Sequence, residues 1–158
     1  DYLNPPGNNL AFCLSTEKLL DIEIPERAQA LRVIMCELSR IASHLVWLGT
    51  HALDIGAMTV FLYCWREREM ILDLNEEISG VRMMTRYLRI GGVAKDATRP
   101  WLDGIRDFIE YFPPKVDEYE RLLTKNPIWL IVRKELVLLR EKRLSTGVLV
   151  GLHCGHRE

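Results

Sequence analysis

Residues 25–53, PERAQALRVIMCELSRIASHLVWLGTHAL, contain the strongest structural signal in the sequence. Small and apolar side chains recur there at steps of three or four residues, which places them on one face of an α-helix: Ala28, Leu31, Ile34, Leu38, Ile41, Leu45 and Leu48. Pro25 suits the start of a helix, where a missing N–H group costs no hydrogen bond. The pattern predicts a helix from Pro25 to about Leu53, roughly 40 Å long at the usual rise per residue.

Helical patterns continue after this segment. The predicted elements are a helix over 59–79 ending at Gly80, a short element over 81–90, a break at Gly91–Gly92, a helix from Pro100 interrupted at Pro113 and Pro114, and a helix up to Pro127. No apolar–polar alternation typical of β-strands occurs before residue 130. The sequence therefore predicts a mainly α protein.

The region before the long helix is predicted to begin as a loop. DYLNPPGNNL, residues 1–10, is rich in proline and asparagine, which favour turns. Residues 11–24 are then predicted to form a short helix with Phe12, Leu19 and Leu20 on its apolar side.

Composition excludes several classes of protein. The chain has 158 residues, 48% of them hydrophobic, which is enough for one domain with a core. A net charge of −1 gives no bulk attraction to nucleic acid or to an anionic membrane surface. No apolar run reaches the roughly 18 residues of a membrane span, and the first residues lack the pattern of a signal peptide.

The four cysteines do not have the spacing of a metal site. Cys13, Cys36, Cys64 and Cys154 lie far apart in the sequence and form no C-x-x-C motif. We expect reduced, buried thiols and no metal or cofactor bound by this chain alone. No glycine-rich phosphate-binding motif is present either.

One face of the long helix carries ionisable groups. His44, Trp47, His51 and Asp54 follow one another at steps of three and four residues. A histidine beside a carboxylate can hold and relay a proton near neutral pH. The alternative is that His51 and Asp54 only cap the helix end through bonds to the backbone.

Two other charged segments allow simpler interpretations. REREMILDLNEE, residues 66–77, is expected to be a solvated helix face with opposite charges three or four residues apart. Arg86 and Arg89 precede a glycine pair and could hold an anion.

The residues alone thus leave two hypotheses: a helical subunit that lends proton-active side chains to a shared site, or a purely structural interaction module.

The segments that carry a family resemblance are DYLNPPGNNLAFCLSTEKLL, ERAQALRVIMCELSRIASHLVWLGTHALDIGAMT, REREMILDLNEEISGVRMM, RIGGVAKD and KVDEYERLLTKNPIWL. Together they resemble the D-type subunits of respiratory complex I, the NADH–quinone oxidoreductase, and more distantly the large subunits of NiFe hydrogenases. The likeness covers residues 1 to about 130, a fragment of the family. It implies the helical-bundle fold of those subunits.

The resemblance also implies a function and partners. The complex would pass electrons from NADH, through FMN and iron–sulfur clusters on partner subunits, to quinone, and couple this to ion translocation. The partners would be the adjacent B-type iron–sulfur protein, the C-type protein and the membrane arm of the complex. The chain would lie peripherally on the cytoplasmic face of a bacterial plasma membrane, or on the matrix side in mitochondria. The fragment by itself is expected to be inactive.

Two site residues follow from the resemblance. The tyrosine of the family's DYL motif, which binds the quinone head group, corresponds to Tyr2. The aspartate of HALDIGA, part of a proton network behind that site, corresponds to Asp54, which we expect to face a buried cavity. The alternative within related families is a helical component of a membrane-bound hydrogenase or ferredoxin-linked complex.

Residues 131–158 do not continue the likeness. The gene can also be read one base earlier, starting at the last base of the Ile131 codon. In this frame the possible codons permit RTKGVGVITREEALDWGVSGPTLRASG, which resembles the family's own continuation. We therefore predict a one-base frameshift near residue 131, so that residues 131–158, with His153 and Cys154, form an out-of-frame tail.

Overall fold

The computed structural model describes residues 3–124 and 126–135, and the chain divides into two compact units, residues 1–115 and 116–158. The elements in chain order are α1 (Pro5–Leu20), α2 (Glu26–Asp54), α3 (Met58–Ser79), β1 (Leu88–Arg89), β2 (Gly92–Val93) and α4 (Arg99–Leu122). A helical stretch over 127–135 follows in the second unit. The prediction of a mainly α protein is confirmed.

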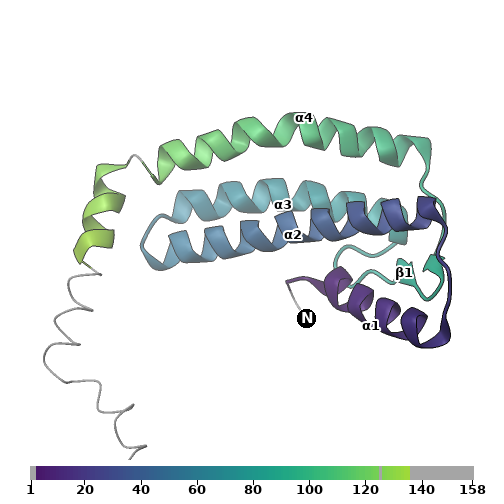
Figure 1. Cartoon of the computed structure of the whole chain (residues 1–158). Helices are drawn as coiled ribbons and strands as arrows, with labels where there is room; N and C mark the ends of the chain where they lie inside the picture. Colours follow the sequence, from purple (N-terminus) through teal and green to yellow (C-terminus); the bar gives the residue numbers. More distant parts are fainter. Residues whose placement is uncertain (1–2, 125, 136–158) are drawn as a thin grey trace, which may run out of the picture. The chain divides into compact units, whose positions relative to one another are not determined.

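The helices α2 and α3 form a long antiparallel hairpin that organises the first unit (Figure 1). Gly49 of α2 packs against α3, where an added Cβ atom would lie 3.4 Å from Cys64 Cβ and from Phe61 Cα, an ordinary van der Waals contact. Gly56, with φ of 94°, turns the chain between the helices. The backbone bonds from Gly56 N to Leu53 O (2.9 Å) and from Ala57 N to Ala52 O (2.8 Å) close the end of α2.

The predicted bounds of α2 and α3 lie within one residue of the observed ones, and Gly80, with φ of 78°, caps α3 as expected. The predicted buried face of α2 is partly wrong, because Ile34, Ile41 and Leu48 are only half-buried. Apolar spacing alone misplaced the face, since the fully buried positions of α2 include polar and small residues: Arg32, Ser39, Ala42, Gly49 and Ala52.

The start of α1 was mispredicted as a loop. Asn4 caps the helix, and its side-chain oxygen accepts a hydrogen bond from Gly7 N at 3.2 Å. Prolines are tolerated at the next two positions because the first helical N–H groups have no intrahelical partners. The predicted apolar side of this helix is also wrong: the buried residues are Pro6, Cys13 and Glu17, while Phe12, Leu19 and Leu20 are exposed.

Two further predictions of local structure fail. A two-stranded antiparallel hairpin, with Arg89 opposite Gly92, forms at the predicted break, and its strands are too short to show an alternating pattern. The helix α4 is continuous through Pro113 and Pro114, so these prolines do not interrupt it. In the first unit α4 is anchored by the buried Trp101, whose indole N–H donates to Leu74 O at 2.9 Å.

A buried ion pair ties α1, α2 and the β-hairpin together. The Arg32 guanidinium donates to Glu17 at 2.6 and 3.0 Å, to Arg89 O at 2.6 Å and to Gly92 O at 3.0 Å. Glu17 Oε1 also accepts from Gly91 N at 2.7 Å. The hydrogen bond from Arg32 holds the pKa of Glu17 below its usual range, although burial acts in the opposite direction.

We expect Arg32→Met to lower the free energy of unfolding by about 3–5 kcal/mol at neutral pH, because it leaves the Glu17 carboxylate buried without its cation. The pKa of Glu17 is lowered on folding, so the wild-type pair stabilises above the unfolded pKa and loses this effect as pH falls through the folded pKa. The difference in the free energy of unfolding between the variant and the wild type should therefore become smaller in acid. Urea unfolding at neutral pH and at acid pH would measure it.

Arg27→Met is the matched control. Arg27 pairs with Asp96 at 2.7 Å, but both side chains are more than 60% exposed, so this change should cost no more than about 1 kcal/mol. Equal losses in the two variants would contradict the importance of the buried pair.

Candidate functional site

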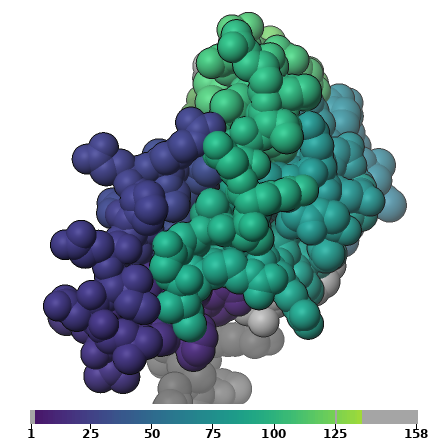
Figure 2. All heavy atoms as spheres, turned by 90° about the vertical axis from the view of Figure 1, so that its right-hand side faces the viewer, coloured from purple at the N-terminus to yellow at the C-terminus, as the bar shows by residue number. Residues whose placement is uncertain are grey.

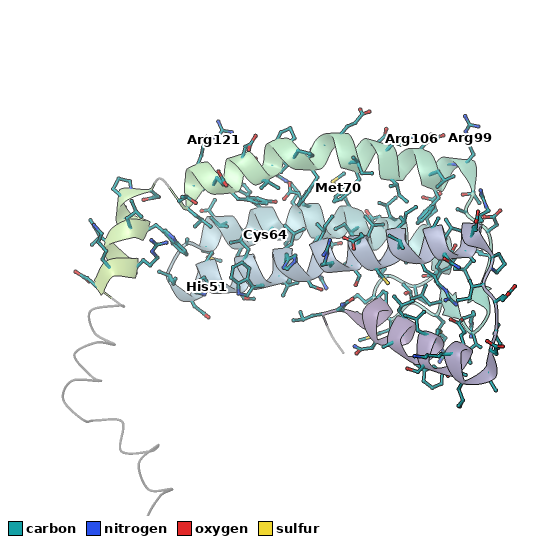
Figure 3. The ribbon with its side chains drawn as sticks, viewed as in Figure 1. His51, Cys64, Met70, Arg99, Arg106 and Arg121 are labelled. Atoms are coloured by element: carbon teal, nitrogen blue, oxygen red, sulfur yellow. The ribbon has the colours of Figure 1, made fainter. Side chains whose placement is uncertain are left out.

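The predicted ionisable face of α2 exists and is exposed. His44, Trp47, His51 and Asp54 all lie on the surface of the first unit. The rings of Trp47 and His51 are stacked, with centroids 5.9 Å apart and planes 8° from parallel. Figure 3 shows His51 close to the end of α2 that leads into α3. One helix face therefore combines an aromatic surface with groups that can bind protons.

Asp54 is the last residue of α2, and its surroundings differ from the expectation of a buried cavity. Its side chain is exposed in the chain by itself, and within the described residues its carboxylate has no hydrogen bond or ion pair. The backbone bonds given above close this helix end, so the alternative role of Asp54 as a side-chain cap is wrong.

Helix electrostatics do not explain a carboxylate at this position. The C-terminal end of a helix carries partial negative charge, which disfavours a carboxylate by about 0.3–1 kcal/mol. Asp54 is thus neither bonded within the described chain nor favoured by the helix that carries it.

Apolar side chains surround the same end of the α2–α3 hairpin. Met58 and Leu62 on α3 are 61% and 56% exposed, and Trp47 on α2 is 61% exposed. Phe61 and Trp65 stack on each other with centroids 4.4 Å apart. Exposed apolar and aromatic groups beside a carboxylate are typical of a surface that another chain or an apolar ligand covers.

Tyr2 lies outside the described residues, but the residue that follows it is positioned on α2. Ser43 Oγ lies 2.8 Å from Leu3 O, and Ser39 Oγ donates to Asn4 Oδ1 at 2.8 Å. Ser39 and Ser43 are one helical turn apart, and Trp47 is one turn further along the same helix face. Residues 3 and 4 therefore contact α2 on the face that leads to His51 and Asp54.

A small cavity with both polar and apolar lining residues lies beside Leu3, Pro5 and Pro6. It measures about 20 Å³, room for one water molecule, and its polar lining residues are Ser39, Arg68 and Asn75. Arg68 is buried and lies over the Trp65 ring, with its guanidinium carbon 5.4 Å from the ring centroid. The Arg68 guanidinium group is therefore a buried cation that lines the same cavity as Leu3 and Pro5.

The expectation that residues 66–77 form a solvated face is only partly correct. Arg82 pairs on the surface with Glu69, Asp73 and Glu76, as expected of a solvated helix. Glu67 and Arg68, however, are buried. Glu67 accepts hydrogen bonds from Arg66 at 2.7 Å and from the Tyr111 hydroxyl at 3.2 Å.

The β-hairpin carries the two arginines considered as an anion site. Arg86 and Arg89 are exposed and line surface recesses, one with Asn9 and Phe12 and one with Lys95. Figure 2 shows this end of the first unit, where the teal segment of the hairpin lies beside the blue residues that begin α2. Binding of an anion there stays a prediction.

The cysteine thiols of the described region have low reactivity. Cys13 and Cys64 are buried, as expected, and Cys36 is half-buried. Burial raises the pKa of all three, that of Cys64 to about 11, so little thiolate exists at neutral pH. Over the residues the structure describes, no three His, Cys, Asp or Glu side chains gather as metal ligands do.

No helix within the described ranges combines the length and the apolar composition needed to cross a bilayer.

Comparison with known proteins agrees with the family expected from the sequence. The family model of the respiratory-chain NADH dehydrogenase 49 kDa subunit matches residues 54–152. The chain is 60% identical over 130 residues to an NADH-quinone oxidoreductase D-type subunit of Chloroflexus aurantiacus, covering 82% of this chain and 32% of that protein. It is 58% identical over 130 residues to the corresponding protein of Geobacter sulfurreducens, covering 82% and 33%.

A third relative aligns over a longer stretch. A D-type protein of the same name from Koribacter versatilis is 55% identical over 148 residues, which cover 93% of this chain and 37% of that protein. This alignment and the family model both extend past residue 130, so the comparisons leave the expected boundary there a prediction. The chain spans about a third of the length of these relatives. With a family model that matches 99 of its 158 residues, the chain belongs to the family of the respiratory-chain NADH dehydrogenase 49 kDa subunit.

Proposed function

We propose that this chain is part of a subunit of an NADH–quinone oxidoreductase, and that the α2 face ending at Asp54, with the N-terminal segment that contains Tyr2, contributes to the quinone site. The observation that carries the proposal is the exposed carboxylate of Asp54, which has no partner within the described chain and lies beside exposed apolar groups. The named relatives supply the reaction class, because each is called an NADH-quinone oxidoreductase subunit.

The chemistry of quinone reduction fits the residues on this face. A quinone becomes a quinol by taking up two electrons and two protons, so its site needs a hydrogen-bond donor for a carbonyl oxygen and a route for protons. The phenol of Tyr2 can donate such a bond. Asp54 follows His51 by three positions on the same helix face, so the two side chains can lie along one route for protons.

Electrons would come from groups that other subunits hold. NADH would be oxidised at FMN and the electrons passed through iron–sulfur clusters of partner chains, while this chain contributes only amino-acid side chains. The exposed apolar groups Trp47, Met58 and Leu62 give a surface for the adjacent B-type iron–sulfur protein, which would bury Asp54. The C-type protein and the membrane arm would be the other partners, with ion translocation coupled to the reaction.

The site would lie beside a membrane, since the quinone substrate is apolar. We propose a peripheral location on the cytoplasmic face of a bacterial plasma membrane, or on the matrix side of the inner membrane if the complex is mitochondrial.

We also propose that residues 131–158 are translated out of frame and have no part in this function. Sequencing the gene across codon 131, from independent amplifications, tests this directly. We expect an extra or missing base at this codon, and its correction should restore the alternative reading given above. An intact reading frame that encodes residues 131–158 in messenger RNA and in protein would overturn the proposal.

Asp54→Asn, made in the intact complex, tests the proton role. The substitution keeps the size of the side chain but removes its charge, so quinone-linked turnover should fall and its pH dependence should shift, while NADH oxidation by artificial acceptors continues. The fold should not suffer, because a carboxylate at a helix C-terminus is slightly unfavourable. Turnover measured against pH, with the amount of assembled complex as the control, decides the matter; wild-type quinone kinetics would exclude the role.

Tyr2→Phe tests the head-group contact. The change removes the hydroxyl and keeps the ring, so the quinone reductase rate should fall by roughly tenfold, about the effect of one lost hydrogen bond. Assembly and NADH oxidation by artificial acceptors should stay normal. Steady-state kinetics with a short-chain quinone would measure the effect, and an unchanged rate would remove Tyr2 from the site.

A further inference from the structure

The chain that leads to Tyr2 is attached to α2 by two serine side chains, and we propose that Ser39 and Ser43 are positioning residues of the quinone site. They hold residues 3 and 4, which directly follow Tyr2 in the sequence, against α2. This inference rests on the proposed function, because it assigns the serines to the same site.

Ser39 fixes the segment through the cap of α1. Its buried hydroxyl donates to Asn4 Oδ1 at 2.8 Å, and the same oxygen accepts from Gly7 N at 3.2 Å. A Cβ atom at position 7 would lie 2.5 Å from Asn4 Nδ2, so a side chain there would displace the amide. One amide oxygen therefore connects the first turn of α1 to α2.

Ser43 fixes the residue before that cap. Its hydroxyl oxygen lies 2.8 Å from Leu3 O and 2.8 Å from Ser39 O, and its single proton is shared between these acceptors. A bond from serine to the carbonyl four residues earlier is common in helices and needs no other segment. The contact with Leu3, forty positions away in the sequence, is the feature that local helix structure does not require.

The attachment bears on the site because only one peptide unit separates Leu3 from Tyr2. Neighbouring Cα atoms are about 3.8 Å apart, so a displacement of Leu3 is passed on to Tyr2. A misplacement of about 1 Å can lower an enzymatic rate by up to about a hundredfold. The same rigid helix carries Asp54 eleven residues after Ser43, about 16 Å along the axis, so α2 fixes the spacing of both groups.

The test is Ser43→Ala in the intact complex, with Ser43→Thr as the variant that keeps the hydroxyl. We expect Ser43→Ala to raise the KM for a short-chain quinone roughly three- to tenfold, the factor for one ordinary hydrogen bond, and Ser43→Thr to restore most of the loss. Assembly and NADH oxidation by artificial acceptors should remain at wild-type levels.

Ser15→Ala is the matched control, because the Ser15 hydroxyl donates only to Ala11 O within α1, at 2.8 Å. It should leave the KM unchanged. If Ser43→Ala fails to assemble, Ser39→Ala breaks the neighbouring contact instead and leaves the Asn4–Gly7 bond intact, with the same expected rise in KM.

Two further readouts separate positioning from a general loss of stability. Hydrogen exchange of residues 3–9 should be faster in Ser43→Ala than in Ser15→Ala. In a Tyr2→Phe background, Ser43→Ala should add little to the loss of quinone reductase activity, since both changes act through the Tyr2 hydroxyl.

The outcomes distinguish this inference from the proposed function. If Tyr2→Phe slows quinone reduction while Ser43→Ala and Ser39→Ala leave the KM unchanged, the positioning role is overturned and the function stands. A fully additive double variant also overturns positioning. If Tyr2→Phe itself has normal quinone kinetics, the head-group contact is overturned, and the positioning role with it.

Discussion

The buried ion pair between Glu17 and Arg32 is the interaction on which the arrangement of the first unit depends. α1 lies at one end of the α2–α3 hairpin and exposes most of its apolar side chains, so hydrophobic burial alone holds it weakly. The ion pair fixes the position of α1 on α2, because a charged group that donates to several fixed acceptors can occupy few alternative positions. The contacts to Arg89 O and Gly92 O extend the same constraint to the β-hairpin.

The ion pair between Glu17 and Arg32 orders neighbouring elements, whatever it contributes to the free energy of unfolding. Removing two charges from water is expensive, and a buried pair does not always stabilise a protein. Here each partner is also bonded to backbone groups of the hairpin, so α1 and the hairpin are ordered together. The helix α1 is then held at both ends: by the ion pair near its C-terminus, and by the bonds of Ser39 and Ser43 to residues 3 and 4 at its start.

Sequence patterns predicted α2 and α3 well because long helices with a regular apolar face have a strong periodic signal. They failed where single polar contacts decide the structure. The asparagine–proline–proline sequence at residues 4–6 was interpreted as a loop, although it also fits the start of a capped helix. No local pattern predicts the buried pair of Glu17 and Arg32, because these partners lie 15 positions apart in the sequence.

The candidate site shows the same limit. The shared face of His51 and Asp54 followed from helical spacing, whereas the roles of Tyr2 and Asp54 came only from family resemblance. The Ser39 and Ser43 contacts were invisible, since serines in a helix interior carry no signal of their tertiary partners. Their spacing by one turn, on the face that also carries Trp47, was the only available hint.

The length of α2 between Ser43 and Asp54 has an evolutionary consequence. In a helix of 3.6 residues per turn, inserting or deleting one residue rotates everything beyond it by about 100°. Such a change would turn Asp54 away from the side on which the N-terminal segment is attached, without disturbing any loop. The family should therefore vary in length in its connecting segments, such as residues 94–98, and keep a constant number of residues along this stretch of α2.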